Sequence, residues 1–241
     1  MVIKSDSKPG RISGFSLIET AIVMVIIGAL LGGLLVSLSS TQEINFRSDA
    51  ESQVDEILEA LYGFAQANGR LPCPATAASN GAEAPAGGGA CTEQYGFVPS
   101  ATLGLSGAVN TDTLMVDPWL SPYRYNVTTA NGNAFTTAGG MRATGMAALA
   151  PDLRVCTDAA CGTVVANNLP AVIVSLGADW ANFSGAEEVE NSGETTRSGY
   201  RHANNTDFAV TTYIEDTFDD IIVWMSPNIL YTRMISAGQL P

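Results

Sequence analysis

An apolar stretch close to the amino terminus constrains the fold of this chain more than any other feature. Residues 15–38 form a largely hydrophobic run of 24 residues. A transmembrane helix needs about 20 such residues, so the run is long enough to cross a bilayer. The residues before it, 1–14, contain Lys4, Lys8 and Arg11 against one acid. Because basic flanks stay on the cytoplasmic side, we expect a cytoplasmic leader, a transmembrane segment at about 15–38 and an exported remainder.

The charge of the chain changes abruptly after this leader. The whole chain of 241 residues has 11 Lys and Arg against 24 Asp and Glu, a net charge of −13. Residues 15–241 contain eight Arg, no Lys and 23 acids, a net charge of −15. A chain this acidic repels polyanions, so we expect no nucleic-acid partner. The loss of lysine after Gly14 suggests that residues 1–14 lie in another compartment or are removed.

Glu19, an acid inside the apolar run, argues against two simple interpretations of this segment. A plain membrane anchor fits the run, and so does a signal peptide cleaved near residues 37–39. Neither explains Glu19, because a carboxylate inside such a segment costs about 2.5–3.5 kcal/mol on insertion scales. A carboxylate is tolerated best in lipid when an ammonium group neutralises it. Glu19 therefore indicates a partner that carries a positive charge.

The start of the apolar run resembles a known processing signal. Residues 14–19 read Gly-Phe-Ser-Leu-Ile-Glu, similar to the cleavage and methylation signal of type IV pilins and type II secretion pseudopilins. The resemblance implies that prepilin peptidase cuts after Gly14 and that Phe15 is N-methylated. It also implies that Glu19 pairs with the terminal amine of a neighbouring subunit. Gly28 and Gly32 are four residues apart, a spacing that permits close helix packing in a filament.

This resemblance predicts a structural role. We expect a minor pilin or minor pseudopilin that resides in the inner membrane, with its head in the periplasm, before it assembles into a pilus or pseudopilus. The implied partners are prepilin peptidase, other pilin or pseudopilin subunits, the inner-membrane assembly platform and membrane lipid. The alternative is a membrane- or tip-displayed adhesion module, in which the same anchor carries a head that binds a ligand.

The helix that begins in the apolar run is predicted to continue to residue 69. Residues 42–62 contain no Pro or Gly, and Val54, Ile57 and Leu61 recur at helical spacing. The pair Asn68-Gly69 is typical of a helix end. Residues 15–69 should therefore form one long helix that packs on a globular head of residues 70–241.

The head has the pattern of a β-rich domain. Strand-like runs occur at 123–129, 171–176, 208–214 and 221–225. They predict an antiparallel sheet packed on the long helix, an α+β pilin-like fold. Segment 75–91 is predicted to be an irregular loop. Ser226-Pro227 predicts the start of a short helix, which Gly238 should stop.

Four cysteines lie in the exported part of the chain, at Cys73, Cys91, Cys156 and Cys161. They allow three disulfide pairings. Proximity in the sequence favours Cys73 with Cys91 and Cys156 with Cys161, and an oxidising periplasm permits both. A zinc site is a weak alternative, because the chain has no C-x-x-C motif and only one histidine, His202.

Three motifs of the head also resemble pseudopilins. They are Asp-Pro-Trp-Leu-Ser-Pro-Tyr at 117–123, Ser-Leu-Gly-Ala-Asp at 175–179 and Phe-Asp-Asp-Ile-Ile-Val-Trp at 218–224. In the major pseudopilin of type II secretion, the loop between the last two motifs binds calcium. The resemblance thus implies a calcium site at Asp179 with Asp219 or Asp220, whose carboxylates suit a hard cation.

The loop between these motifs departs from the family pattern. Thirty-nine residues separate Asp179 from Asp219, and the insertion at 180–207 is acidic, with Glu187 and Glu188 among its charges. Its length favours a minor, specialised subunit. The alternative to calcium binding is a solvated acidic loop, with residues 219–220 capping a strand.

Motifs of catalysis are missing from the sequence. It contains no G-x-S-x-G elbow, P-loop, H-E-x-x-H motif or EF-hand spacing. Asp219 and Asp220 are adjacent, and adjacent residues of a strand point to opposite faces, unlike the paired acids of a glycosidase. His202 lies in a polar stretch typical of a solvated loop. We therefore expect no enzyme activity.

Overall fold

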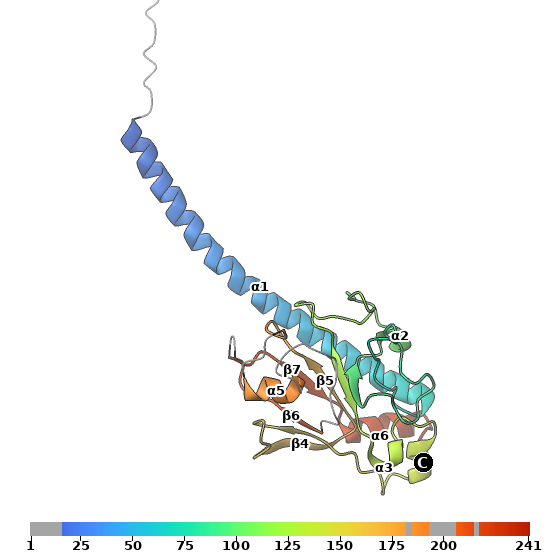
Figure 1. Ribbon diagram of the computed structural model, residues 1–241. Helices are drawn as coiled ribbons and strands as arrows, with labels where there is room; N and C mark the ends of the chain where they lie inside the picture. Colours follow the sequence, from blue (N-terminus) through green and yellow to red (C-terminus); the bar gives the residue numbers. More distant parts are fainter. Residues whose placement is uncertain (1–15, 182–184, 193–205, 215–216) are drawn as a thin grey trace, which may run out of the picture. The chain divides into compact units, whose positions relative to one another are not determined.

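The computed structural model describes residues 16–181, 185–192, 206–214 and 217–241; the side chains of residues 31–40 are not described. It is a mixture of helices, mainly antiparallel sheets and irregular loops (Figure 1). The chain divides into two compact units, Met1–Asn45 and Phe46–Pro241. The predicted α+β class is confirmed. The predicted leader at 1–14 lies outside the described residues.

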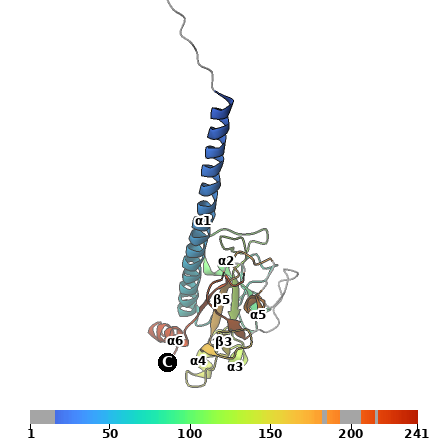
Figure 2. The same cartoon turned by 90° about the vertical axis from the view of Figure 1, so that its left-hand side faces the viewer.

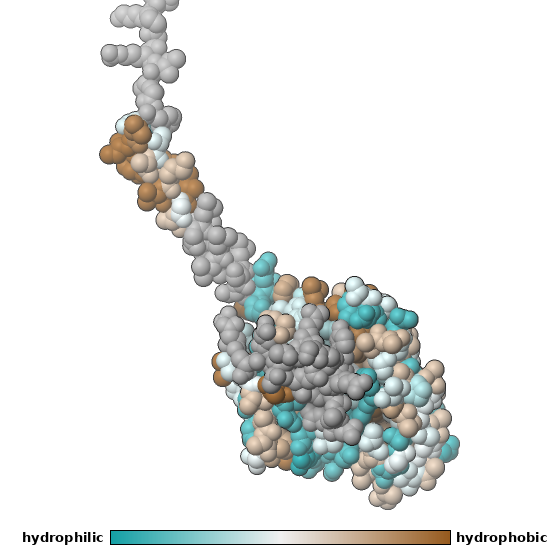
Figure 3. All heavy atoms as spheres, in the orientation of Figure 1, coloured by the Kyte–Doolittle hydropathy of each residue, from teal (hydrophilic) through white to brown (hydrophobic). Residues whose placement is uncertain are grey.

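Helix α1 extends over Leu17–Asn68. In the first unit its large apolar side chains are exposed, from Ile27 at 46% to Leu17 at 90% (Figure 3). The helix predicted over 15–69 is confirmed at 17–30 and 41–68, where it is fully described. Among the described residues, no helix has both the length and the apolarity of a membrane span. The span predicted at about 15–38 includes residues outside that description.

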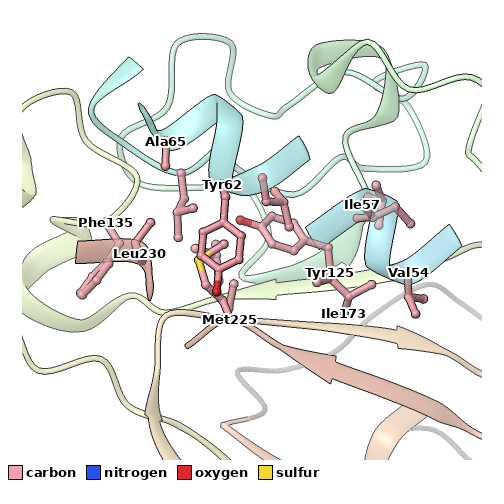
Figure 4. Packing of buried hydrophobic residues seen from close by; sticks show 14 of the residues in the cluster. Val54, Ile57, Tyr62, Ala65, Tyr125, Phe135, Ile173, Met225 and Leu230 are labelled. Carbon is pink, nitrogen blue, oxygen red and sulfur yellow. The ribbon is translucent and has the colours of Figure 1, made fainter. Parts of the chain in front are cut away.

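In the second unit α1 is amphipathic. Ala50, Val54, Ile57, Leu61 and Ala65 recur every three or four residues, and each is at most 1% exposed. They join a core cluster with side chains from the sheet and from the C-terminal helix (Figure 4). The helix ends where the Asn-Gly pair predicts, because Gly69 adopts a φ of +68° that favours glycine.

The first sheet has four strands in the order β1-β2-β5-β7, and each neighbouring pair is antiparallel. The strands are β1 Tyr95–Phe97, β2 Arg124–Val127, β5 Ala171–Ser175 and β7 Ile221–Trp224. Ala171 and Ile173 belong to the core cluster that contains α1, whereas Val172 and Val174 belong to a second cluster. Since successive side chains of a strand point to opposite faces, the sheet is buried on both sides at β5.

A second sheet covers the other face of the first. Its order is β4-β3-β6, with strands β3 Leu153–Cys156, β4 Val164–Leu169 and β6 Asp207–Ala209. Strands β3 and β4 are antiparallel, while β3 and β6 are parallel. Leu153, Val155 and Phe208 pack with Val172 and Val174 in the second cluster. The head therefore has three layers, α1, the first sheet and the second sheet.

The remaining helices are short. They are α2 Ser100–Leu103, α3 Ala130–Asn133, α4 Gly140–Thr144, α5 Ala186–Ser192 and α6 Pro227–Ser236. The predicted C-terminal helix is confirmed as α6, with Ser226 at its N-cap position and Pro227 in its first turn. Leu230 and Met234 of α6 belong to the core cluster that contains the buried face of α1. Figure 2 shows α6 beside the carboxyl end of α1.

The sequence predicted part of this strand pattern. The runs at 123–129, 171–176 and 221–225 correspond to β2, β5 and β7. The strand predicted at 208–214 is shorter than expected, because β6 ends at Ala209. Strands β1, β3 and β4 were not predicted from the sequence. Strand β4 is mostly exposed and contains Asn168 at a φ of +54°, so its sequence lacks the pattern of a buried strand.

Covalent and ionic contacts hold the loop that follows α1. Both predicted disulfides are present. Cys73–Cys91 closes this loop, whereas Cys156–Cys161 joins the end of β3 to the turn before β4. The loop predicted at 75–91 is irregular. A buried ion pair between Arg70 and Glu83 stabilises it. Arg70 donates two hydrogen bonds of 2.7 Å to the Glu83 carboxylate. Charge-assisted bidentate bonds of this kind are strong, and this one holds a loop that has few apolar side chains.

The packing of α1 on the head can be tested at Ile57. This side chain is fully buried, so Ile57→Ala should lower the free energy of unfolding by about 2–5 kcal/mol. Chemical denaturation of the purified chain measures this change. The exposed neighbour Glu56 is the matched control, and Glu56→Ala should change stability by less than about 0.5 kcal/mol. Equal losses in the two variants would contradict the packing described here.

Candidate metal centre

Two neighbouring strands and an inserted helix bring three acids together. Strands β5 and β7 pair with Ser175 opposite Ile221, so the residues after β5 lie beside those before β7. Asp179 follows β5, Asp219 precedes β7, and Glu188 belongs to α5. One carboxylate oxygen of each lies within 4.8 Å of the other two. These three side chains form the candidate metal centre.

The turn after β5 is shaped around the Asp219 carboxylate. Gly177 has a φ of +65°, and a Cβ at this position would lie 2.0 Å from Asp219 Oδ1. Only glycine fits here. The N–H of Ala178 donates a hydrogen bond to Asp219 Oδ2. From α1, Arg47 Nη1 donates to the backbone carbonyl of Asp219 at 3.3 Å. The turn and α1 together fix the position of this acid.

A further set of polar contacts supports the turn. Asp117 Oδ2 accepts a hydrogen bond of 2.6 Å from the Ser175 hydroxyl. Asp117 Oδ1 accepts from the N–H groups of Trp119 and Ser121. The Trp180 indole donates to the Trp119 carbonyl at 3.2 Å. These contacts join the motifs at 117–123 and 175–179. Burial raises the pKa of Asp117 to about 7 despite these donors.

The three acids repel one another strongly. Glu188 and Asp219 are buried, and Asp179 is half-buried. The carboxylate oxygens lie within 4.8 Å of one another, and two like charges at about that distance would repel by about 3.5 kcal/mol at an effective dielectric constant of about 20. Burial, followed by the Asp219 and Glu188 charges, raises the pKa of Asp179 to about 7. The arrangement therefore favours neutralisation, by protons or by a cation.

The residues at this position fit a hard divalent cation. Every candidate ligand atom is a carboxylate oxygen, the donor type that calcium prefers. Asp179 Oδ1 is a buried atom with no hydrogen-bond partner among the residues that the structure describes, and a bound cation would satisfy it. Asp179, Glu188 and Asp219 would hold the ion, and calcium would complete its six to eight ligands with backbone carbonyls or water. The positive charge of the ion would offset the repulsion among the three carboxylates.

The structure agrees in part with the ligands predicted from the sequence. It brings Asp179 and Asp219 together, but Asp220 is not in the group of three. Asp220 accepts a 2.7 Å hydrogen bond from the Asn191 side chain instead. Glu188 was not predicted as a ligand, although the insertion that contains it is acidic. Only the position of α5 beside β5 and β7 gives Glu188 this role.

The residues predicted to act in processing and assembly belong to the first unit. Glu19 lies in the first turn of α1 and is exposed. A Cβ at Gly28 would have no neighbour within 4 Å. Gly14 and Phe15 lie outside the described residues, as do the surroundings of Gly32. His202 lies outside them too.

Comparison with known proteins finds no match to a family model, to a curated protein or to a solved structure. The assignment of a function therefore rests on the residues of this chain and on their geometry.

The pKa values of two acids predict how stability depends on pH. Asp117 and Asp179 have pKa values of about 7 in the folded chain, far above the usual value of an aspartate. The folded state therefore binds more protons than the unfolded state between about pH 4 and pH 7. The stability that these two groups contribute is fully present below this window and is lost as the pH rises through it. Thermal unfolding without metal should give a melting temperature several degrees higher near about pH 5 than near about pH 8.

The variant Asp117→Asn provides the control for this effect. It removes one of the two titrating groups, so the melting temperature should depend less on pH than in the wild type. A melting temperature that rises between about pH 5 and about pH 8 would contradict the raised pKa values.

Calcium should stabilise the chain at neutral pH. At a concentration about 100-fold above its dissociation constant, a ligand adds about 2.7 kcal/mol of stability. For a chain of this size we expect the melting temperature to rise by about 5–10 °C. Asp219→Asn removes a central ligand and should abolish most of this rise, whereas Glu187→Gln, outside the group of three, should retain it. No rise in the wild type, or equal rises in both variants, would argue against the site.

Proposed function

We propose that this chain is a pilin-like structural subunit, a minor pilin or minor pseudopilin that assembles through its amino-terminal helix into a type IV pilus or type II secretion filament. The observation that carries the proposal is the run Gly-Phe-Ser-Leu-Ile-Glu at 14–19, directly before the apolar part of α1. In this proposal prepilin peptidase cuts after Gly14, and Phe15 becomes the methylated amino terminus.

The surface of the first unit supports assembly through the helix. Its apolar side chains are exposed over consecutive turns, and contiguous apolar surface of this kind marks an interaction site. Lipid would cover it before assembly, and the helices of other subunits would cover it afterwards. Open space around Gly28 leaves room for a close helix contact.

Glu19 gives the assembly a specific polar contact. Its side chain is exposed, and it is the one charged residue of the apolar run at 15–38. In an apolar surrounding, a carboxylate needs a positive partner. The methylated terminal amine of a neighbouring subunit would provide that charge. This pairing would set the position of one subunit along the next.

The properties of the head support an extracytoplasmic location. Two disulfides suit an oxidising compartment such as the periplasm. A helix packed on an antiparallel sheet is compatible with a pilin-like head. The candidate metal centre connects the turn after β5 with the start of β7, so a cation there would stabilise the head. We therefore place the subunit in the inner membrane, with its head in the periplasm.

Intact-mass spectrometry after co-expression with a prepilin peptidase tests the proposal. The wild-type chain should lose residues 1–14 and gain one methyl group on Phe15. Gly14→Ala should block both changes, because the peptidase recognises this glycine. Gly10→Ala lies in the same leader and serves as the matched control, which should be processed normally. An uncut chain that begins at Met1 would contradict the proposal and indicate a membrane-anchored binding module.

A further inference from the structure

Apolar and aromatic side chains gather on the head around Phe46, the first residue of the second unit. We call this surface the aromatic patch, and its members are Phe46, Trp119, Leu120, Tyr213 and Ile214. Leu120 is 66% exposed and Ile214 is 53% exposed, while Phe46 and Tyr213 are each 39% exposed. A group of exposed apolar side chains of this kind marks an interaction site.

Contacts with α1 join the patch into one surface. The Phe46 and Trp119 rings meet edge to face, with their centroids 6.1 Å apart. The next residue of α1 is Arg47, whose guanidinium lies over the Tyr213 ring at 4.7 Å from the centroid. The first turn of α1 in the second unit therefore contacts two segments that are far apart in the sequence, 119–120 and 213–214.

The turn that displays Leu120 has a strained backbone. Leu120 has a φ of +69°, a conformation that is rare for a bulky residue and easy for glycine. Its N–H donates to the Asp117 carbonyl at 2.9 Å, and Asp117 Oδ1 accepts from the residues on both sides of Leu120. Trp119 packs against the main core cluster. The fold thus fixes a large apolar side chain outside the core, where it contributes little to the stability of the head.

Ile214 is attached to the head in a comparable way. Its N–H donates to the Phe218 carbonyl at 3.0 Å, and the Phe218 N–H donates to the Ile214 carbonyl at 2.8 Å. Phe218 is buried in the second cluster. Both segments of the patch are therefore anchored in the head, while their apolar side chains remain exposed.

The place of the patch in the chain indicates what covers it. Phe46 follows Leu38, the end of the apolar run, by eight residues, which corresponds to about 12 Å of helix. The headgroup layer on each side of a bilayer is about 5–8 Å deep. With the apolar run in the membrane, the patch lies close to this layer. Tryptophan and tyrosine are enriched there, because their rings have an apolar body and a polar edge.

We infer that the aromatic patch rests in the headgroup layer of the membrane while the subunit is unassembled. The inference rests on the proposed function, because it needs the apolar run in the membrane. It goes beyond that function by assigning a lipid contact to the head itself. Residues 15–241 have a net charge of −15, so anionic lipid does not attract the head. Insertion of apolar side chains, rather than charge, drives this contact.

Trp119 reports on the contact directly. The full chain is reconstituted in phosphatidylcholine vesicles, with or without lipid that carries bromine near the headgroup end of its acyl chains, since bromine quenches tryptophan at close range. The wild type has three tryptophans, so it should lose up to about one third of its emission, the share of Trp119. Trp119→Phe keeps an aromatic ring and should show little quenching. Trp224→Phe removes a tryptophan of β7 outside the patch and should still be quenched.

A second variant separates membrane contact from folding. Leu120→Gly removes the apolar side chain and suits the backbone at this position, so the melting temperature should change little. Quenching of Trp119 should nevertheless fall about twofold or more, because interfacial binding scales with apolar area. Ile235→Ser is the matched control, since Ile235 is 43% exposed on α6, beside the carboxyl end of α1 (Figure 2). This control should be quenched as the wild type is.

Flotation of the vesicles distinguishes the ways in which the inference can fail. If the chain floats with the vesicles and Trp119 is not quenched, the chain is in the membrane and only the inference is wrong. If protection of that unquenched Trp119 from a water-soluble quencher then rises with the number of chains per vesicle, a second copy covers the patch in place of lipid. If the chain does not float, the membrane location in the proposed function fails, and the inference fails with it.

Discussion

The burial of β5 on both faces is the constraint on which the rest of the head depends. All five of its residues are buried, and it pairs with β2 on one side and β7 on the other. Each buried Val or Ile contributes about 1.5–3 kcal/mol relative to an exposed position. A strand that is buried on both faces does not fix its register through alternation. The hydrogen bond from the Ser175 hydroxyl to Asp117 favours the register that β5 adopts.

The register between β5 and β7 determines where Asp179 and Asp219 lie. With Ser175 opposite Ile221, the chain leaves β5 and enters β7 at the same edge of the sheet. The Gly177 turn then places Asp179 beside Asp219 without a side chain in the way. The acids lie at the rim of the apolar core, where burial strengthens their repulsion and any attraction to a cation. The packing of the sheet thus produces the charge pattern of the site.

The features that could be predicted from the sequence are those encoded locally. The 3.6-residue period of Val54, Ile57 and Leu61 predicted the packing face of α1, and apolar runs predicted β2, β5 and β7. Sequence proximity predicted both disulfides, and the motif resemblance led to Asp179 and Asp219. The parallel pairing of β3 with β6 joins Val155 to Phe208, and no local pattern encodes a contact between residues so far apart. The role of Glu188 was missed for the same reason, because it arises from where α5 docks.

Two helices attach to the sheets of the head by different kinds of contact. Helix α1 is held by apolar side chains such as Ile57 and Leu61, whose burial does not depend on dissolved ions. Helix α5 is held by polar contacts, chiefly the hydrogen bonds of the Asn191 side chain with Ala209 and Asp220. Local stability differs between such regions of one domain. The packing between α1 and the first sheet therefore depends on apolar burial, whereas the position of α5 depends on a few directional hydrogen bonds.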